Sequence, residues 1–259
     1  MENKAAAGHP GRLDKWIAQQ GRLSRSDVKA LIRTGQIEVN GVRARAPEQK
    51  ITEHDEVRVQ GKLLQLRRHA YLMMNKPAGV LSATEDKKDR TVLDLVPPGL
   101  RRPGLFPAGR LDKDTEGFVL LTDDGLFAHR VLAPTAHVPK TYFARIRGEA
   151  DLSALVHAFA VGMDLGGGDR ASPAELRILA AGNVPEVTVT VYEGVYHQVK
   201  RMFGRFGMEV IHLRRTHIGG LALDERLPSG GCRIIIDKEL EKIWLNYTEK
   251  AEEASPGLG

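Results

Sequence analysis

The sequence has a single cysteine, Cys232, and no long apolar segment. One cysteine excludes an internal disulfide and a cysteine-based metal cluster. The longest apolar runs, such as residues 118–121, are far shorter than the ~20 residues that a membrane-spanning helix needs. The N-terminal stretch MENKAAAGHPGRLDK lacks the apolar region of a secretory signal. These absences predict a reducing, cytoplasmic setting and no membrane partner.

Several common catalytic and cofactor motifs are also missing. There is no P-loop, HExxH, GxSxG or CxxC pattern, and the glycines at 166–168 lack dinucleotide-binding spacing. His197, His212 and His217 have no matching carboxylate or cysteine partners in the pattern, so a metal site is not expected. We therefore expect chemistry based on carboxylates, with no metal and no organic cofactor.

Positive charge is concentrated in the N-terminal quarter of the chain. Residues 1–68 contain 14 Lys or Arg and 8 Asp or Glu, whereas residues 69–259 contain 24 and 25. A compact basic module beside a near-neutral body indicates a docking domain for a polyanion such as nucleic acid. On charge alone, a merely solvated basic face is an equal alternative.

The N-terminal module reads as two helices followed by a small sheet. Residues 12–20 have helical apolar spacing, and Ser24 with Asp27 predicts a capping box for a second helix that ends at Gly35. Strands are expected at 36–39 and 56–59, with a tight turn at Asn40-Gly41. We place this domain at residues 11–60 and a basic linker at 61–69.

The remaining chain predicts a larger domain over residues 70–245 and a flexible tail over 246–259. Strand patterns recur at 71–76, 118–121, 141–146 and 187–191, and residues 198–206 read as a helix. Because no sustained βαβ rhythm is present, the fold class is α+β with a mainly antiparallel mixed sheet.

The stretch GRLDKDTEG at 109–117 is the most unusual loop, with five charged residues among nine. Its acidic spacing partly matches a calcium loop, but Pro107 precedes it and a strand-like run follows, where an EF-hand needs two flanking helices. Position 12 of that loop would also be Asp123, which is too short for the usual bidentate ligand. We reject calcium binding, although a polar turn remains a sufficient explanation of this stretch taken alone.

Ordered motifs give the chain a family resemblance over roughly residues 11–235. RLDK at 12–15, SR at 24–25, LIRxG at 31–35 and VNG at 39–41 resemble the S4 RNA-binding domain. NKPxG at 75–79, GRLD at 109–112, KTY at 140–142, EGxYHQVKRM at 193–202 and IGG at 218–220 resemble the pseudouridine synthases in their usual order. The resemblance is to the branch that modifies small-subunit (16S) ribosomal RNA, at a uridine of the 516 type.

The resemblance implies a role for five residues of the larger domain. Asp112 would be the catalytic carboxylate, which attacks the ribose or the base or removes a sugar proton. Lys200 would pair with Asp112, and Tyr142 would stack on the target uracil. Leu213 would form an apolar pocket floor, and Arg110 would fill the gap left by the flipped base. By position alone, Lys200 lies on a solvated helix face, Tyr142 in a half-buried strand and Leu213 in the core.

The resemblance also implies an RNA partner for the basic module. Its phosphate-binding surface would consist of five residues: Arg12, Lys15, Arg25, Lys29 and Arg33. We expect a monomer that acts on ribosomal RNA, as small-subunit RNA or an assembly intermediate. The alternatives are an enzyme of the same family that modifies 23S RNA and a non-catalytic RNA-binding assembly factor.

Overall fold

The computed structural model describes residues 10–149 and 151–245. They form two compact units: one contains the residues up to Ala70 together with Val96–Leu105, and the other contains Tyr71–Leu95 and the residues from Phe106 onward. The predicted tail at 246–259 lies outside the described residues.

Two short helices form one side of the first unit. Helix α1 spans Leu13–Gln19 and α2 spans Arg25–Arg33. The predicted capping box at the start of α2 is confirmed, because the Asp27 amide donates to the Ser24 hydroxyl (3.2 Å) and the Ser24 amide donates to the Asp27 carboxylate (2.9 Å). The apolar faces of the helices pack on the sheet through a cluster that includes Leu13, Ile17 and Val28.

The sheet of the first unit has the strand order β3-β2-β5-β6 and is antiparallel. Its strands are β2 (Ile37–Val39), β3 (Val42–Arg43), β5 (Val57–Val59) and β6 (Lys62–Leu64), and β1 (Gly11–Arg12) pairs separately with β4 (Lys50–Ile51). Asn40 and Gly41 have φ angles of 52° and 77°, as a tight hairpin turn requires.

The expected linker at 61–69 is wrong for its first half. Lys62–Leu64 forms strand β6 on β5, and Leu66 is buried in the core of the first unit. The positive φ angles at Gln60 and Gly61, 51° and 75°, turn the chain back into a hairpin. The linker was expected from the basic residues Arg67 and Arg68, which follow the strand, whereas the three residues of β6 are too few to show a strand pattern.

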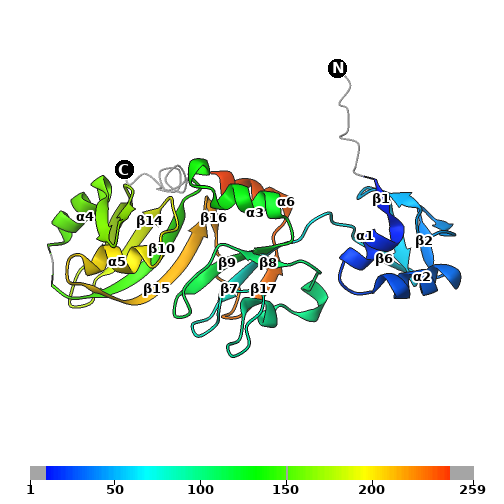
Figure 1. Ribbon diagram of the computed structural model, residues 1–259, viewed down its shortest axis with the longest axis horizontal. Coiled ribbons are helices and arrows are strands. Elements are labelled where there is room, and N and C mark those ends of the chain that lie inside the picture. The colour runs from blue at the N-terminus through cyan, green and yellow to red at the C-terminus, as the bar shows by residue number, and fades with distance from the viewer. Residues whose placement is uncertain (1–9, 150, 246–259) are drawn as a thin grey trace, which may run out of the picture. The chain divides into compact units, whose positions relative to one another are not determined.

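The second unit is built on one large mixed sheet (Figure 1). Its path is β13-β14-β10-β15-β9-β7-β17, with β16 attached to β15 and β8 to β9. All of these pairs are antiparallel except β9 with β15, which confirms the α+β class. The strands are β7 (Tyr71–Lys76), β8 (Phe106–Ala108), β9 (Glu116–Thr122), β10 (Lys140–Arg147), β13 (Glu175–Ala180), β14 (Glu186–Val191), β15 (Glu209–Ile218), β16 (Leu221–Ala222) and β17 (Cys232–Ile234), beside a separate hairpin of β11 (Met163–Gly166) and β12 (Asp169–Ala171).

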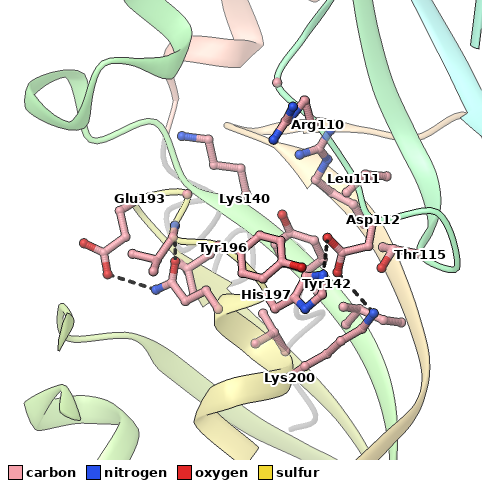
Figure 2. Close-up of a pocket in the computed structure, with 18 of the residues that line it drawn as sticks. Arg110, Leu111, Asp112, Thr115, Lys140, Tyr142, Glu193, Tyr196, His197 and Lys200 are labelled. Atoms are coloured by element: carbon pink, nitrogen blue, oxygen red, sulfur yellow. Dashed lines mark hydrogen bonds and ion pairs between the residues drawn. The ribbon is translucent and has the colours of Figure 1, made fainter. Parts of the chain in front are cut away.

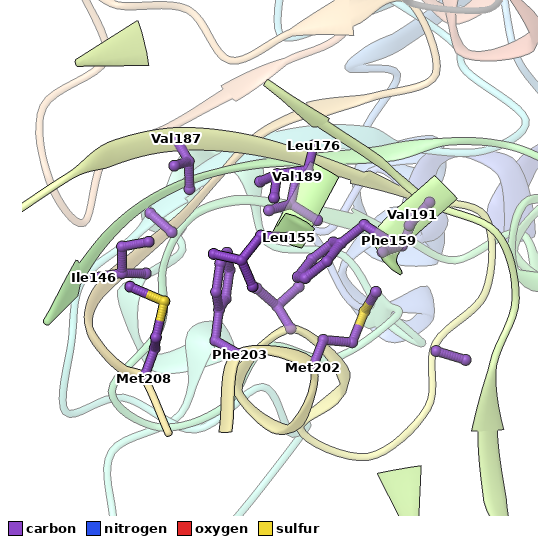
Figure 3. Packing of buried hydrophobic residues seen from close by; sticks show 14 of the residues in the cluster. Ile146, Leu155, Phe159, Leu176, Val187, Val189, Val191, Met202, Phe203 and Met208 are labelled. Atoms are coloured by element: carbon purple, nitrogen blue, oxygen red, sulfur yellow. The ribbon is translucent and has the colours of Figure 1, made fainter. Parts of the chain in front are cut away.

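Helices pack on this sheet and bury two apolar cores against it. Helices α4 (Leu152–Val161) and α5 (Gln198–Gly204) pack Phe159 and Phe203 against the valines of β14, as Figure 3 shows. Helix α3 (Gly125–Leu132) covers β8 and β9 through Ala128 and Val131. The remaining short helices are α6 (Asp237–Leu240) and the 3₁₀ turns Val92–Leu95, Pro98–Leu100, Pro134–Ala136 and Glu241–Trp244. Within residues 10–149 and 151–245, no helix has the length and apolar character that crossing a lipid bilayer requires.

Candidate active site

A pocket of about 400 Å³ opens in the second unit where the 109–115 loop meets strands β10 and β15 and the start of α5. Figure 2 shows Asp112 from the loop, Tyr142 from β10 and Lys200 from α5 around it. The segment 193–197 before α5 forms another wall. Leu132 and Pro134 complete the lining, so five chain segments that are distant in the sequence form this one pocket.

The 109–115 loop is held by buried groups from the strand end and turn before it. The Lys76 ammonium donates to the carbonyl oxygens of Lys113 (3.1 Å), Thr115 (2.7 Å) and Pro77 (3.0 Å). The Ser82 hydroxyl donates to the Leu111 carbonyl and accepts from its amide, at 3.1 and 3.0 Å. Burial lowers the pKa of Lys76 to about 8. The backbone on both sides of Asp112 is thus fixed before any substrate binds.

Two glycines allow the loop to lie close to its neighbours. Gly109 has a φ of 91°, and Gly117 has a φ of 98° at the place where β9 pairs with β15. A Cβ at Gly117 would come within 2.3 Å of the Arg215 carbonyl oxygen, which no side chain tolerates. Both positions favour glycine for their conformation, and Gly117 also requires it for space.

The Asp112 carboxylate lies between two basic groups from α5 and its N-cap. One oxygen is 3.1 Å from the Lys200 ammonium and the other is 3.3 Å from His197 Nε2. Lys200 also binds Asp114 at 2.7 Å. The Asp112 side chain is 28% exposed, whereas that of Asp114 is 74% exposed. Asp112 is therefore the carboxylate turned toward the pocket, and Asp114 supports Lys200 from outside.

The ion pairs shift the pKa of Lys200 and of Asp114. Burial lowers the pKa of Lys200, but its hydrogen bonds to Asp114 and Asp112 outweigh burial and raise it above the ordinary value. The Lys200 hydrogen bond lowers the pKa of Asp114 against an opposing effect of burial. At neutral pH Lys200 therefore carries a full positive charge next to Asp112.

The wall before α5 is a hydrogen-bonded turn. Glu193 accepts from the Ser172 amide (2.7 Å) and from the Gln198 side chain (2.9 Å), and Gln198 accepts from the Val195 amide (3.2 Å). His197 has left-handed backbone angles, φ 50° and ψ 32°, directly before the helix. The Tyr196 ring stacks on the His197 ring at 3.8 Å between centroids. The imidazole is thereby held over Asp112.

All five residues that the sequence proposed for the larger domain line this pocket. Arg110 is exposed at its edge, Leu213 is buried in its wall, and Asp112, Tyr142 and Lys200 lie between them. Sequence reasoning missed the contact of His197 with Asp112, although its place three residues before Lys200 on the same helix turn is a usable signal. It also missed Lys140 and Arg215, which line the pocket from inside the sheet.

The basic residues proposed for the first unit have two kinds of surroundings. Arg12 and Arg25 both bind the buried Asp14 carboxylate, at 3.0 and 2.8 Å. The Arg12 hydrogen bond, opposed by burial and reinforced by Arg25, lowers the pKa of Asp14 to about 2. Lys15, Lys29 and Arg33 are exposed. The first pair therefore ties the two helices together, and the other three face solvent.

The acidic and histidine residues of the second unit are not arranged as a metal centre. Among the residues that the structure describes, no group of three or more His, Cys, Asp or Glu side chains could hold a metal ion. The His212 imidazole instead binds Glu116 at 2.7 Å, and burial lowers the pKa of His217 to about 4. Both histidines lie on strand β15, inside the sheet.

Comparison with known proteins identifies the family. Residues 70–204 match the RNA pseudouridylate synthase family, and residues 11–57 match the S4 domain. The chain is 44% identical to the Bacillus subtilis RNA pseudouridine synthase YtzG, with 88% of this chain and 96% of that one covered. It is 39% identical to ribosomal small subunit pseudouridine synthase A of Haemophilus influenzae and 38% identical to the Escherichia coli protein of that name, with 90% of this chain and 99% of each relative covered.

A solved structure shares the architecture of the chain. It is a crystal structure of a pseudouridylate synthase, with 37% sequence identity, a TM-score of 0.61, and coverage of 90% of this chain and 99% of that one. The loop carboxylate, the strand tyrosine and the helix lysine thus lie in a fold that is known to host RNA modification. The chain belongs to the RNA pseudouridine synthase family and carries an S4 domain before its catalytic domain.

Proposed function

We propose that this pseudouridine synthase converts one uridine of 16S ribosomal RNA into pseudouridine, with Asp112 as the catalytic carboxylate. The observation that carries the proposal is the position of Asp112, which faces a pocket lined by Tyr142 and Leu213 and lies within 3.3 Å of both Lys200 and His197. Two relatives that are 38–39% identical are named as small-subunit enzymes, which supports 16S RNA as the substrate.

The reaction moves the glycosidic bond from N1 to C5 of the uracil. A carboxylate suits it because it is ionised at neutral pH and forms a bond that breaks again easily. The contacts with Lys200 and His197 limit the rotation of the Asp112 side chain. In this proposal Tyr142 stacks on the uracil, Leu213 packs beneath it, and the exposed Arg110 occupies the gap that the flipped base leaves in the RNA.

The first test is Asp112→Asn, which keeps the size of the side chain and removes its charge. Pseudouridine formation in 16S RNA should be abolished, while RNA affinity stays close to wild type. The matched control is Asp114→Asn, because Asp114 shares the same loop and the same lysine but points to solvent. Normal turnover by the Asp112 variant would overturn the catalytic assignment.

Mapping of pseudouridine in 16S and 23S RNA after incubation with the wild-type protein tests the target. We expect one modified position, in 16S RNA, of the uridine 516 type. Modification of 23S RNA alone would show that the enzyme belongs to the branch of the family that modifies large-subunit RNA. An absence of any modification, on free RNA and on assembling small subunits alike, would instead favour a non-catalytic assembly factor.

A further inference from the structure

Two buried basic side chains line the pocket opposite the catalytic loop. Lys140 is 7% exposed and Arg215 is 4% exposed. Arg215 on β15 is the direct register partner of Tyr142 on β10, and Lys140 lies two residues before Tyr142 and therefore on the same face of that strand. The guanidinium carbon of Arg215 is 6.0 Å from the centre of the Tyr142 ring.

Neither cation is neutralised by a carboxylate among the residues that the structure describes. The Lys140 ammonium has one long hydrogen bond, 3.5 Å to the Val131 carbonyl oxygen. Arg215 donates through Nε to the Phe118 carbonyl oxygen at 2.7 Å, and its buried Nη2 has no hydrogen-bond partner. A buried charge without a counter-ion destabilises the fold, so a folded protein keeps one chiefly where its function uses it.

Lys140 still carries charge at neutral pH. Burial, and then the positive charge of Arg215, lower the pKa of Lys140 to about 8. The pocket therefore presents two positive charges on its sheet side and the Asp112 carboxylate on its loop side. An ideal ligand would be electron-rich where it faces the sheet and electron-poor where it faces Asp112.

The pseudouridine reaction creates this distribution of charge. When the bond between N1 of the uracil and C1′ of the ribose breaks, its electron pair goes to the base, whose negative charge spreads over N1, O2 and O4, while C1′ becomes electron-poor. The base then turns, the pair for the new bond comes from C5, and the proton on C5 is transferred to N1. The product is an isomer of the substrate, so no further reactant is needed.

We propose that Lys140 and Arg215 form an anion site for the detached uracil, which holds the negatively charged base in the pocket while it turns. The inference rests on the proposed function of the same pocket. Because the charge develops only during the reaction, these cations would act on the chemical step more than on RNA binding. They lie on the side of the pocket opposite the Asp112 carboxylate.

The test is Lys140→Met, which keeps the apolar stem of the side chain and removes its charge. The single-turnover rate at saturating RNA should fall by about 10²-fold, the usual effect of losing one preorganised electrostatic group. The dissociation constant for RNA should stay within about threefold of wild type, because ground-state contacts are unchanged. Lys140→Arg, which restores the charge, should recover most of the rate. Arg215→Met is the second variant, with the same split expected.

Arg147→Met is the matched control, since Arg147 lies on the same strand but is exposed on the opposite face. It should leave both the rate and the affinity unchanged. A Lys140→Met enzyme that folds normally, as shown by its unfolding temperature, and keeps the wild-type rate would overturn the anion site. So would a loss confined to RNA affinity, which would assign these cations to a phosphate. If the wild type itself makes no pseudouridine, the proposed function fails first, so the two failures are distinguishable.

Discussion

At the scale of single residues, some side chains of the site could be predicted from the sequence and others could not. Asp112 and Lys200 belong to distinctive motifs, and the structure places their charged atoms 3.1 Å apart. Lys140 lies in the KTY motif, in which only the tyrosine was given a role, and Arg215 lies in a strand outside the quoted motifs. Only the pairing of β10 with β15 brings them to the pocket, and that pairing is a long-range contact without a local signal.

The lysine next to Asp112 gives a prediction at this scale. Lys200→Met should reduce the single-turnover rate by about 10²-fold, because Asp112 loses the partner that orients it. Lys200→Arg should retain more of the rate, since charge is kept while the geometry changes. Pseudouridine yield against time on 16S RNA measures both variants. Equal rates for the methionine and arginine variants would show that the positive charge is not what Lys200 contributes.

At the scale of elements, short sequence motifs correctly predicted the features that depend on interactions between near neighbours in the chain. The capping box of α2 and the Asn40-Gly41 turn were visible because each depends on residues within three or four positions. Strand β6 was missed because its pairing with β5 depends on the hairpin as a whole and its three residues are too few to show a strand pattern. The inclusion of Val96–Leu105 in the first unit was missed for the same reason: it rests on contacts such as that of the Arg102 side chain with the Arg67 carbonyl oxygen.

The anchoring of the 109–115 loop leads to a second prediction. Lys76→Met would leave the carbonyl oxygens of Thr115 and Pro77 without this buried donor, whereas that of Lys113 still accepts from the Gly79 amide at 2.7 Å. Each unsatisfied buried group costs about 1–3 kcal/mol, so the unfolding free energy of the catalytic unit should fall clearly. The turnover rate should fall as well, because Asp112 belongs to the loosened loop. Denaturant unfolding and single-turnover rates check the two effects, and unchanged values for both would show that the loop holds its shape without Lys76.

The ion pairs of Asp14 with Arg12 and Arg25, which connect the helices of the first unit, give a prediction about the dependence of stability on pH. Asp14 is buried, and the guanidinium groups of Arg12 and Arg25 lower its pKa to about 2. A carboxylate whose pKa is lowered by folding stabilises the folded state above its unfolded pKa of about 4, and this contribution is lost as the pH falls toward 2. After allowance for solvent screening at the half-exposed arginines, it amounts to about 1–2 kcal/mol.

Asp14→Asn tests this linkage directly. Trp16 is buried in the first unit, so its fluorescence in a Trp244→Phe background reports the unfolding of that unit. The variant should be less stable than its background at pH 7, and the difference should shrink as the pH approaches 2. A stability difference of the same size at both pH values would mean that the charge of Asp14 is not what stabilises the contact between the helices.

At the scale of the whole molecule, the two units differ in how their charges are distributed. The N-terminal quarter carries the net positive charge, whereas the catalytic unit carries its functional charges inside a pocket. Phosphate contacts position an RNA with little dependence on its sequence, whereas a pocket selects one base. This division agrees with an S4 domain ahead of a synthase domain. The sequence could predict this division because composition and motif order can be read without knowing any three-dimensional contact.

The same division predicts how RNA affinity depends on salt. Lys15, Lys29 and Arg33 are exposed, whereas Arg12 and Arg25 also hold Asp14, so reversing the charge of the arginine pair would disturb stability as well as binding. Lys29→Glu is therefore the cleaner variant. In an Asp112→Asn background, which stops turnover, it should weaken RNA binding and reduce the slope of log affinity against log salt by about 0.7–0.9 for each phosphate that is no longer neutralised. Lys238→Glu makes the same change in net charge on an exposed position of α6 and should leave the slope nearly unchanged. Equal effects of the two reversals would mean that net charge, and not the surface of α2, attracts the RNA.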